Sequence, residues 1–183
     1  MKTRNTARFH GITILELLIA LTAVAFVILI SVPGSSMVLE KYRMKKTSDN
    51  LVNSINSARY EALRRHSTVR ICPSSNGKFC RRDGDWNQGW LVFSDGNGDR
   101  IAQEIELLES FEKPNENIRI FADGAVKSSA SFNVAGLEGD NEAVNGSFML
   151  CYLGSGEQAK NLFVNEEGWV EITYNDRKGC ESV

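Results

Sequence analysis

The sequence has few of the residues that most often carry catalysis. Of its 183 residues only two are histidines, His10 near the N-terminus and His66 in the first half of the chain. No nucleophile–base pair and no pair of acids at a catalytic spacing accompanies either of them. We therefore expect no enzymatic activity, no cofactor and no metal.

Charge is missing from one long stretch. The 22 residues from Gly11 to Val32 contain a single charged residue, Glu16, and Pro33 follows them. This length suits a membrane-spanning helix, which needs roughly 20 apolar residues. A secretory signal peptide fits poorly, because its apolar region is shorter and is followed by a small-residue cleavage site. A carboxylate within lipid is costly, so Glu16 indicates a function.

The charges outside this stretch predict an orientation. Three basic and no acidic residues precede it, and no basic residue occurs between Gly11 and Glu40. The positive-inside rule then places the N-terminus in the cytoplasm and the body in the periplasm. The net charge of the chain is −2, and because the leader is basic, the body is acidic. An acidic body argues against general nucleic-acid binding.

The start of the apolar stretch resembles the type IV prepilin signature, G-F-T-L-x-E. This chain reads Gly11-Ile12-Thr13-Ile14-Leu15-Glu16, with Ile12 at the position where Phe is commonest. The resemblance implies that prepilin peptidase cleaves between Gly11 and Ile12 and methylates the new amine of Ile12. The alternative is a signal anchor in which Glu16 has no special role.

Glu16 and the new N-terminal amine have the charges of an ion pair. An unpaired buried carboxylate is expensive, whereas one paired with a cation is tolerated. The amine of Ile12 lies about one helical turn from Glu16. In a packed bundle, we expect Glu16 of one subunit to meet the Ile12 amine of its neighbour.

The residues after Pro33 predict a second helical stretch and then strands. Apolar residues at spacings of seven, four, three and four share one helix face in residues 34–66: Met44, Leu51, Ile55, Ala58 and Ala62. Pro33 and Gly34 should bend the helix. From Thr68 onward, short apolar segments alternate with turn residues, which indicates antiparallel sheets. The expected strands are 69–72, 90–94, 104–110, 118–121, 131–134, 147–153, 161–164 and 170–174, with 136–146 as a loop.

The body resembles the GspH/FimT/FimU group of minor pilins. The matching residues are Val69 to Ser74 (VRICPS), Cys80, Trp86, Gly89 to Asp95 (GWLVFSD) and Phe132 to Gly136 (FNVAG). The resemblance implies an α+β pilin fold, in which a long, kinked N-terminal helix packs on an antiparallel sheet domain. It divides the chain into a leader (1–11), a transmembrane and polymerisation helix (12–33), a second helical half (34–67) and a periplasmic sheet domain (68–183).

The cysteines agree with a periplasmic body. There are four of them, Cys72, Cys80, Cys151 and Cys180, and they allow three pairings among which the sequence does not decide. We favour Cys72–Cys80 as a clip of a local loop and Cys151–Cys180 as a tie for the C-terminal tail. A structural zinc site would need C-x2-C or C-x4-C spacing. Here seven residues separate the first two cysteines, which argues against zinc.

One loop has a partial match to a calcium site. Asp95 to Asp99, with Glu106 further on, places oxygens at the alternating positions of a calcium-binding loop. Arg100 replaces the glycine that makes the sharp turn in such loops. The competing interpretation is a hairpin turn, because Asp, Gly and Asn adopt positive φ easily.

A DNA-binding patch is a further candidate. Six basic residues lie near the helix end and the first cysteine loop: Arg64, Arg65, Arg70, Lys78, Arg81 and Arg82. They form either such a patch or a solvated, partly paired surface. DNA-binding FimT-like pilins carry G-R-x-R near the C-terminus, whereas this chain has Gly168-Trp169-Val170-Glu171 there. Both arginines are missing, so DNA is not an expected partner.

Together these features predict a minor pilin of a type IV pilus, in the complex that primes pilus assembly for twitching motility and adhesion. Its expected partners are prepilin peptidase, other minor pilins, the major pilin and the inner membrane. It is expected to lie in the inner membrane with a periplasmic body before it enters the pilus. The alternatives are a GspH-type minor pseudopilin of type II secretion and a FimT-like DNA-uptake receptor.

Overall fold

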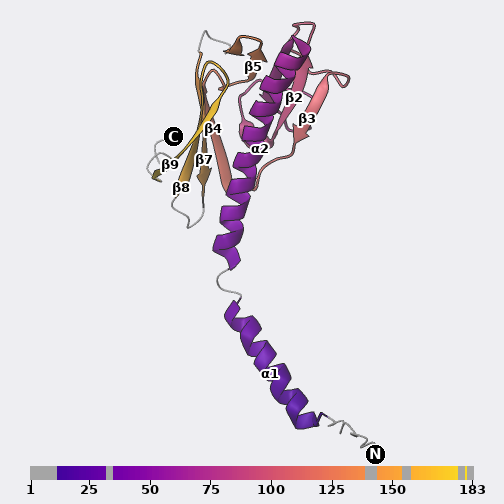
Figure 1. Cartoon of the computed structure of the whole chain (residues 1–183), viewed down its shortest axis with the longest axis vertical. Helices are drawn as coiled ribbons and strands as arrows, with labels where there is room; N and C mark the ends of the chain where they lie inside the picture. The colour runs from indigo at the N-terminus through magenta and orange to yellow at the C-terminus, as the bar shows by residue number, and fades with distance from the viewer. Residues whose placement is uncertain (1–11, 32–34, 139–143, 154–157, 177–179, 181–183) are drawn as a thin grey trace, which may run out of the picture. The chain divides into compact units, whose positions relative to one another are not determined.

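The computed structural model describes residues 12–31, 35–138, 144–153, 158–176 and 180 (Figure 1). The chain divides into two compact units, residues 1–39 and 40–183. The first contains α1 (Ile14–Ser31) and the start of α2 (Ser35–Arg65). The second contains the rest of α2 and all of the strands in the described part of the chain.

Helix α1 is apolar all round. Eleven large apolar side chains between Ile12 and Ile28 are exposed in the isolated chain, most of them by more than half. Among the described residues, no helix combines the length and the hydropathy that a membrane crossing needs. The predicted membrane segment, 12–33, stays a prediction. The predicted kink at Pro33 and Gly34 lies outside the described residues.

Helix α2 buries one face. Leu51, Ile55, Ala58 and Ala62 are completely buried, and Met44 packs against the same cluster. The spacing of these residues in the sequence predicted this shared face. The helix ends at Arg65, and His66 follows it with a φ of 52°, the left-handed conformation that commonly terminates a helix.

Two antiparallel sheets follow α2. The first has five strands in the order β3-β2-β1-β5-β6, and the second has four in the order β4-β7-β8-β9. Their bounds are β1 Thr68–Pro73, β2 Trp90–Asp95, β3 Leu107–Phe111, β4 Ile118–Gly124, β5 Ala130–Asn133, β6 Gly136–Glu138, β7 Gly146–Tyr152, β8 Gln158–Val164 and β9 Val170–Asp176. A short 3-10 helix, η2 (Trp86–Gln88), precedes β2. The predicted α+β class, with a helix packed on antiparallel sheets, is confirmed.

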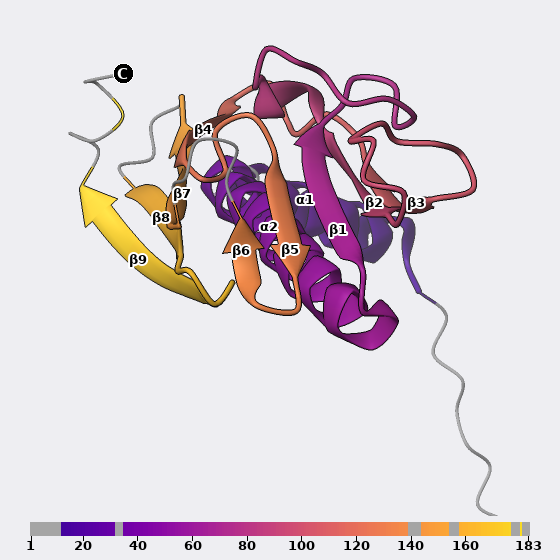
Figure 2. The same cartoon turned by 90° about the horizontal axis from the view of Figure 1, so that it is seen from above.

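One hydrophobic core joins the helix to both sheets. It contains the buried face of α2, Val69, Ile71, Trp90 and Val92 from the first sheet, and Phe148, Leu150 and Leu162 from the second. In Figure 2, α2 lies behind β1, β5 and β6, with β7, β8 and β9 to one side. A smaller cluster of Cys72, Leu91, Phe93 and Ala102 covers the opposite face of the first sheet. Strand β2, which lies between β3 and β1, is therefore buried on both faces.

Four strand predictions differ from the structure by more than two residues. β8 begins at Gln158, three residues before its expected start. β3 begins at Leu107, because residues 104–106 form a turn. β4 continues to Gly124, through residues expected to form a turn. Gly136–Glu138 was expected within a loop but forms β6, which pairs with β5. β6 is too short to show alternation, and it is fixed by a distant contact, in which the Leu137 amide donates to the Glu166 carbonyl at 2.8 Å.

The core predicts where the stability of the body lies. Among the described residues every buried one lies at or after Thr47, so residues 40–183 carry a complete core and should fold without α1. We expect Ile55→Ala to lower the free energy of unfolding of this fragment by about 2–5 kcal/mol, because it leaves a cavity under both sheets.

The matched control is Tyr60→Ala on the same helix, where the side chain is 64% exposed. It should change the stability by no more than roughly 0.5 kcal/mol. Urea denaturation of both variants measures the difference. Equal losses of unfolding free energy in Ile55→Ala and Tyr60→Ala would contradict the assigned core face of α2.

Candidate functional site

The N-terminal motif lies at the start of α1. Gly11 is outside the described residues, and Ile12 and Thr13 directly precede the helix. The Thr13 hydroxyl accepts a hydrogen bond from the Glu16 amide at 3.2 Å. Thr13 is thus the N-cap, and Glu16 occupies the third helical position of a T-x-x-E capping sequence. The T-x-x-E pattern is present in the sequence, although no N-cap was predicted from it.

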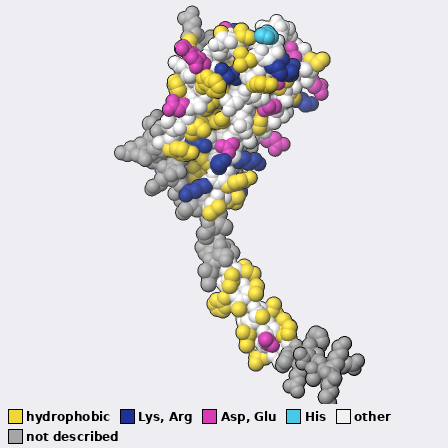
Figure 3. Space-filling model, in the orientation of Figure 1, with side chains coloured by type: hydrophobic (Ala, Val, Ile, Leu, Met, Phe, Trp, Pro, Cys, Tyr) yellow, Lys and Arg dark blue, Asp and Glu magenta, His cyan; other side chains and the backbone are white. Residues whose placement is uncertain are grey.

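Glu16 is exposed in an otherwise apolar surface. Figure 3 shows hydrophobic side chains over the described part of α1. A carboxylate in the first turn suits the positive end of the helix dipole. This local role explains why the helix tolerates Glu16. Because the residue is exposed, its carboxylate remains available to another group.

Two disulfides tie the body. Cys72 is bonded to Cys80 and Cys151 to Cys180, pairs whose residue numbers differ by eight and 29. These are the two pairs favoured from the sequence. The first closes a loop directly after β1, and the second joins β7 to the C-terminal segment.

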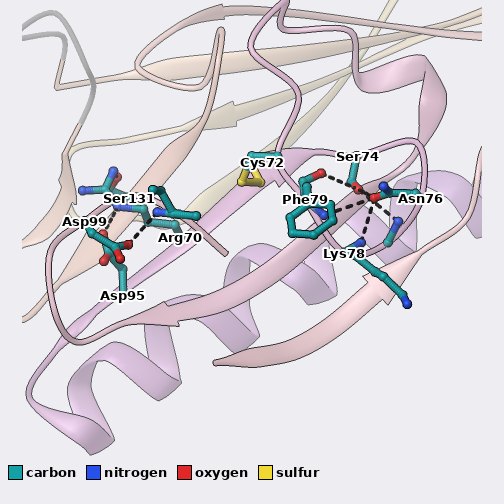
Figure 4. The surroundings of a disulfide bond; sticks show 12 residues. Arg70, Cys72, Ser74, Asn76, Lys78, Phe79, Asp95, Asp99 and Ser131 are labelled. Atoms are coloured by element: carbon teal, nitrogen blue, oxygen red, sulfur yellow. Dashed lines mark hydrogen bonds and ion pairs between the residues drawn. A yellow bond between two sulfur atoms is a disulfide. The ribbon is translucent and has the colours of Figure 1, made fainter. Parts of the chain in front are cut away.

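Side-chain hydrogen bonds fix the loop inside the first disulfide. The Ser74 hydroxyl donates to the Phe79 carbonyl at 2.8 Å and accepts from the Gly77 amide at 3.0 Å. The Asn76 carboxamide oxygen accepts from the amides of Lys78 and Phe79 (Figure 4). The loop therefore has a defined conformation and presents the exposed side chains of Lys78 and Phe79 outward.

A buried ion pair lies on the other side of the same disulfide. Arg70 Nε donates to Asp95 Oδ2 at 2.5 Å, and their side chains are 10% and 0% exposed. Arg70 Nη1 also donates to the Ser131 hydroxyl (Figure 4). The pair ties β2 to β1 and β5. Removing one partner of such a pair costs about 3–5 kcal/mol, because the other charge stays buried.

The loop after Asp95 satisfies its own polar groups. Asp99 accepts hydrogen bonds from the Ile101 amide and from the side chains of Asn97 and Gln103. Asp95 accepts one from the Arg100 amide at 3.4 Å. In the described ranges, no group of three or more His, Cys, Asp and Glu side chains is placed to hold a metal ion.

Most of the basic residues in the candidate DNA patch are paired. Glu61 binds both Arg64 and Arg65, and their hydrogen bonds lower the pKa of Glu61 to about 2. Asp83 binds Arg81, whose hydrogen bond lowers the pKa of Asp83 to about 2. With Arg70 held by Asp95, four of the six basic residues face a carboxylate. A polyanion would compete with these carboxylates.

The segment that replaces G-R-x-R begins β9. Gly168 forms the turn with a φ of 78°, and Trp169 is 54% exposed. The Arg59 guanidinium lies over the Trp169 ring at 4.0 Å, and its Nε donates to the Glu167 carbonyl at 2.8 Å. Trp169 therefore fastens the β8–β9 turn to α2, and the exposed Glu171 adds negative charge beside it.

The architecture is that of a pilin-type structural protein: a helix packed on antiparallel sheets, after an apolar helix with a capped, acidic start. A family model described as Type II transport protein GspH matches residues 47–168. The match spans more than half of the sequence, so the chain belongs to this family. It is a structural protein and not an enzyme.

Solved structures agree on the fold. Two crystal structures of Pseudomonas aeruginosa (strain PAO1) type IV minor pilin FimU, in space groups P21 and P65, match at 16% identity. Their TM-scores are 0.55 and 0.51, and the matches cover 73% and 70% of this chain and 90% and 91% of theirs. No curated protein matches the chain.

The two disulfides predict unequal losses of stability. We expect the double variant C151A/C180A to lose about 1 kcal/mol more than C72A/C80A, because the longer loop restricts the unfolded chain more. Each pair contains one buried cysteine, which makes the two variants a matched comparison. Urea denaturation measures both. Peptide mapping without reductant should recover both native pairs, and crossed pairs or free thiols would contradict the assignment.

Proposed function

We propose that this chain is a minor pilin of a type IV pilus that joins other minor pilins in the complex that primes assembly. The observation that carries the proposal is α1. Its apolar side chains are exposed around the helix, and the prepilin-like motif stands at its start. The family model begins only at residue 47, so this motif supports the proposal independently.

An exposed apolar helix needs a partner. Removing apolar surface from water is favourable by about 25 cal/mol of free energy for each Å² buried. Lipid supplies this cover in the inner membrane, and neighbouring pilin helices supply it in a fibre. We propose that residues 12–33 move from the first environment to the second, while the periplasmic body stays folded.

Processing prepares this transfer. Prepilin peptidase removes residues 1–11 and methylates the amine of Ile12. Glu16 then sets the register of the helix by pairing with the Ile12 amine of a neighbour. The Glu16 carboxylate is costly in lipid and gains a cationic partner only when pilin helices pack together. The pair therefore favours the assembled fibre over a single subunit in the membrane.

Two other functions are weighed against this one. A minor pseudopilin of type II secretion is favoured by the family to which the chain belongs, Type II transport protein GspH. The likeness to FimU favours the pilus, at the level of fold. A DNA-uptake receptor is disfavoured by the carboxylates beside the arginines and by Trp169 and Glu171 in place of arginines.

Deleting the gene in its host and measuring three outputs tests the proposal. We expect fewer or no surface pili and lost twitching, with normal secretion of type II substrates. DNA uptake should fall no further than the loss of pili accounts for. A secretion defect with normal pili would make the chain a pseudopilin. In parallel, submicromolar, strongly salt-dependent binding of duplex DNA by the 40–183 fragment would support a receptor.

A Glu16→Ala variant tests the assembly mechanism. The change makes α1 more apolar, so membrane insertion should be unimpaired. Cleavage should proceed, because the Gly11–Ile12 bond is untouched. We expect a processed, methylated protein that remains in the membrane fraction and is depleted from sheared pili, as judged by mass spectrometry and quantitative blotting.

Two variants control this experiment. Gly11→Val should keep the leader, which shows the unprocessed state. Glu171→Ala removes the same charge from an exposed position of β9 and should leave incorporation unchanged. If the Glu16→Ala protein enters pili at the wild-type level, the proposed pairing is refuted. The assignment as a pilin would still be tested by deletion of the gene.

A further inference from the structure

A basic pocket lies beside the Cys72–Cys80 disulfide. Its volume is about 260 Å³, and its lining includes Arg70, Arg81, Arg82, Arg100 and Ser128. Four of the lining residues are arginines and none is acidic. The volume lies below the range of about 300–1,000 Å³ that is typical of drug-sized ligands. The pocket is therefore suited to a small anion.

The walls of this basic pocket are held in place. The disulfide fixes one side, where the Arg81 amide donates to the Pro73 carbonyl at 2.7 Å. On the other side, Trp86 Nε1 donates to the Lys127 carbonyl at 3.1 Å. Gly84 (φ 71°) allows the closest approach there, because a Cβ on it would lie 2.9 Å from the same carbonyl oxygen. A preformed pocket avoids the entropy of ordering loops on binding.

The four arginines differ in how they are held. Arg70 and Arg81 are oriented by Asp95 and Asp83, two carboxylates that lie outside the lining. Arg82 is exposed, and within the described ranges it has no carboxylate partner. Its guanidinium presents the paired donors that match phosphate oxygens.

Arg100 has a strained backbone conformation. Its φ is 62°, a conformation that glycine adopts cheaply and that is uncommon for a long side chain. Asp95 holds it there by accepting a hydrogen bond from the Arg100 amide. Strained residues of this kind gather at binding sites, where the side chain is needed. The strain places an arginine in the lining, at a position where the turn alone would favour glycine.

We propose that this pocket binds a compact dianionic phosphate group. A phosphate of this kind bears close to two negative charges at neutral pH and several strong acceptor oxygens. Clustered guanidinium groups and the Ser128 hydroxyl are complementary donors. None of the lining residues belongs to α1, so the proposed site does not depend on Glu16. Either a free small phosphate or a lipid whose headgroup is a phosphate monoester supplies this chemistry.

Titration of the 40–183 fragment with pyrophosphate tests the site. Isothermal calorimetry gives the affinity, and the Nε–Hε signals of the arginines in NMR spectra show which side chains respond. We expect Arg82→Gln and Arg100→Gly each to weaken binding roughly tenfold, an effect that corresponds to one lost charge-assisted contact. Arg100→Gly suits the backbone at this position, so the fold should be retained or stabilised.

Lys78→Gln is the matched control. It removes the same charge from an exposed position in the neighbouring loop, outside the lining. Binding should change by less than about twofold, since Lys78 is outside the lining and physiological salt screens exposed charges that make no direct contact. An equal loss in all three variants would show a diffuse electrostatic effect and overturn the site. Absence of pyrophosphate binding would overturn it as well.

Vesicles distinguish the two sources of phosphate. Cosedimentation of the fragment with vesicles that contain phosphatidic acid, lost in Arg82→Gln and displaced by pyrophosphate, would assign the pocket to a lipid headgroup. Pyrophosphate binding without cosedimentation would assign it to a free phosphate. Duplex DNA binding that depends as strongly on Lys78 as on Arg82 would refute a compact pocket in favour of an extended surface.

Discussion

The body depends on a single contact surface, the apolar face of α2. The two sheets share no ladder in the described part of the chain, and each packs its inner side chains against Leu51, Ile55 and their neighbours on this helix. A few bonds link the sheets elsewhere, such as that from the Leu137 amide to the Glu166 carbonyl. Because one helix packs against two sheets, a cavity beneath it would weaken the packing of both, whereas neither disulfide belongs to this shared core.

The residues that carry the family resemblance are largely architectural. Trp86 and Trp90 are buried in the core, and Cys72 is in a disulfide. Gly89 has a φ of 102°, and a Cβ there would lie 2.4 Å from the Phe111 carbonyl oxygen, so only glycine fits. A signature of this kind specifies how the body packs. Contacts with other molecules are left to outward-facing residues such as Trp169 and Arg82.

The sequence predicted those parts of the fold that depend on local patterns. The helix face at Leu51 and Ile55 and most strand positions followed from periodicity. The Arg70–Asp95 pair did not, because it joins residues 25 positions apart and requires the register of β1 against β2, in which Thr68 faces Asp95. That register places Arg70 diagonal to Asp95 on the same face. The strand β6 was missed for a similar reason, since its position depends on a contact with Glu166.

The two units meet opposite physical demands. The body has its core within residues 40–183, whereas α1 exposes its apolar side chains and has none of the buried residues that the structure describes. Under the proposed function, this separation lets α1 exchange lipid for neighbouring helices without unfolding the body. It also explains why the charge proposed to pair with a neighbour lies on α1, at Glu16, and not on the body. Only a group on the exchanging surface changes its surroundings during assembly, and only such a group can make the exchange selective for a neighbour with a free amine.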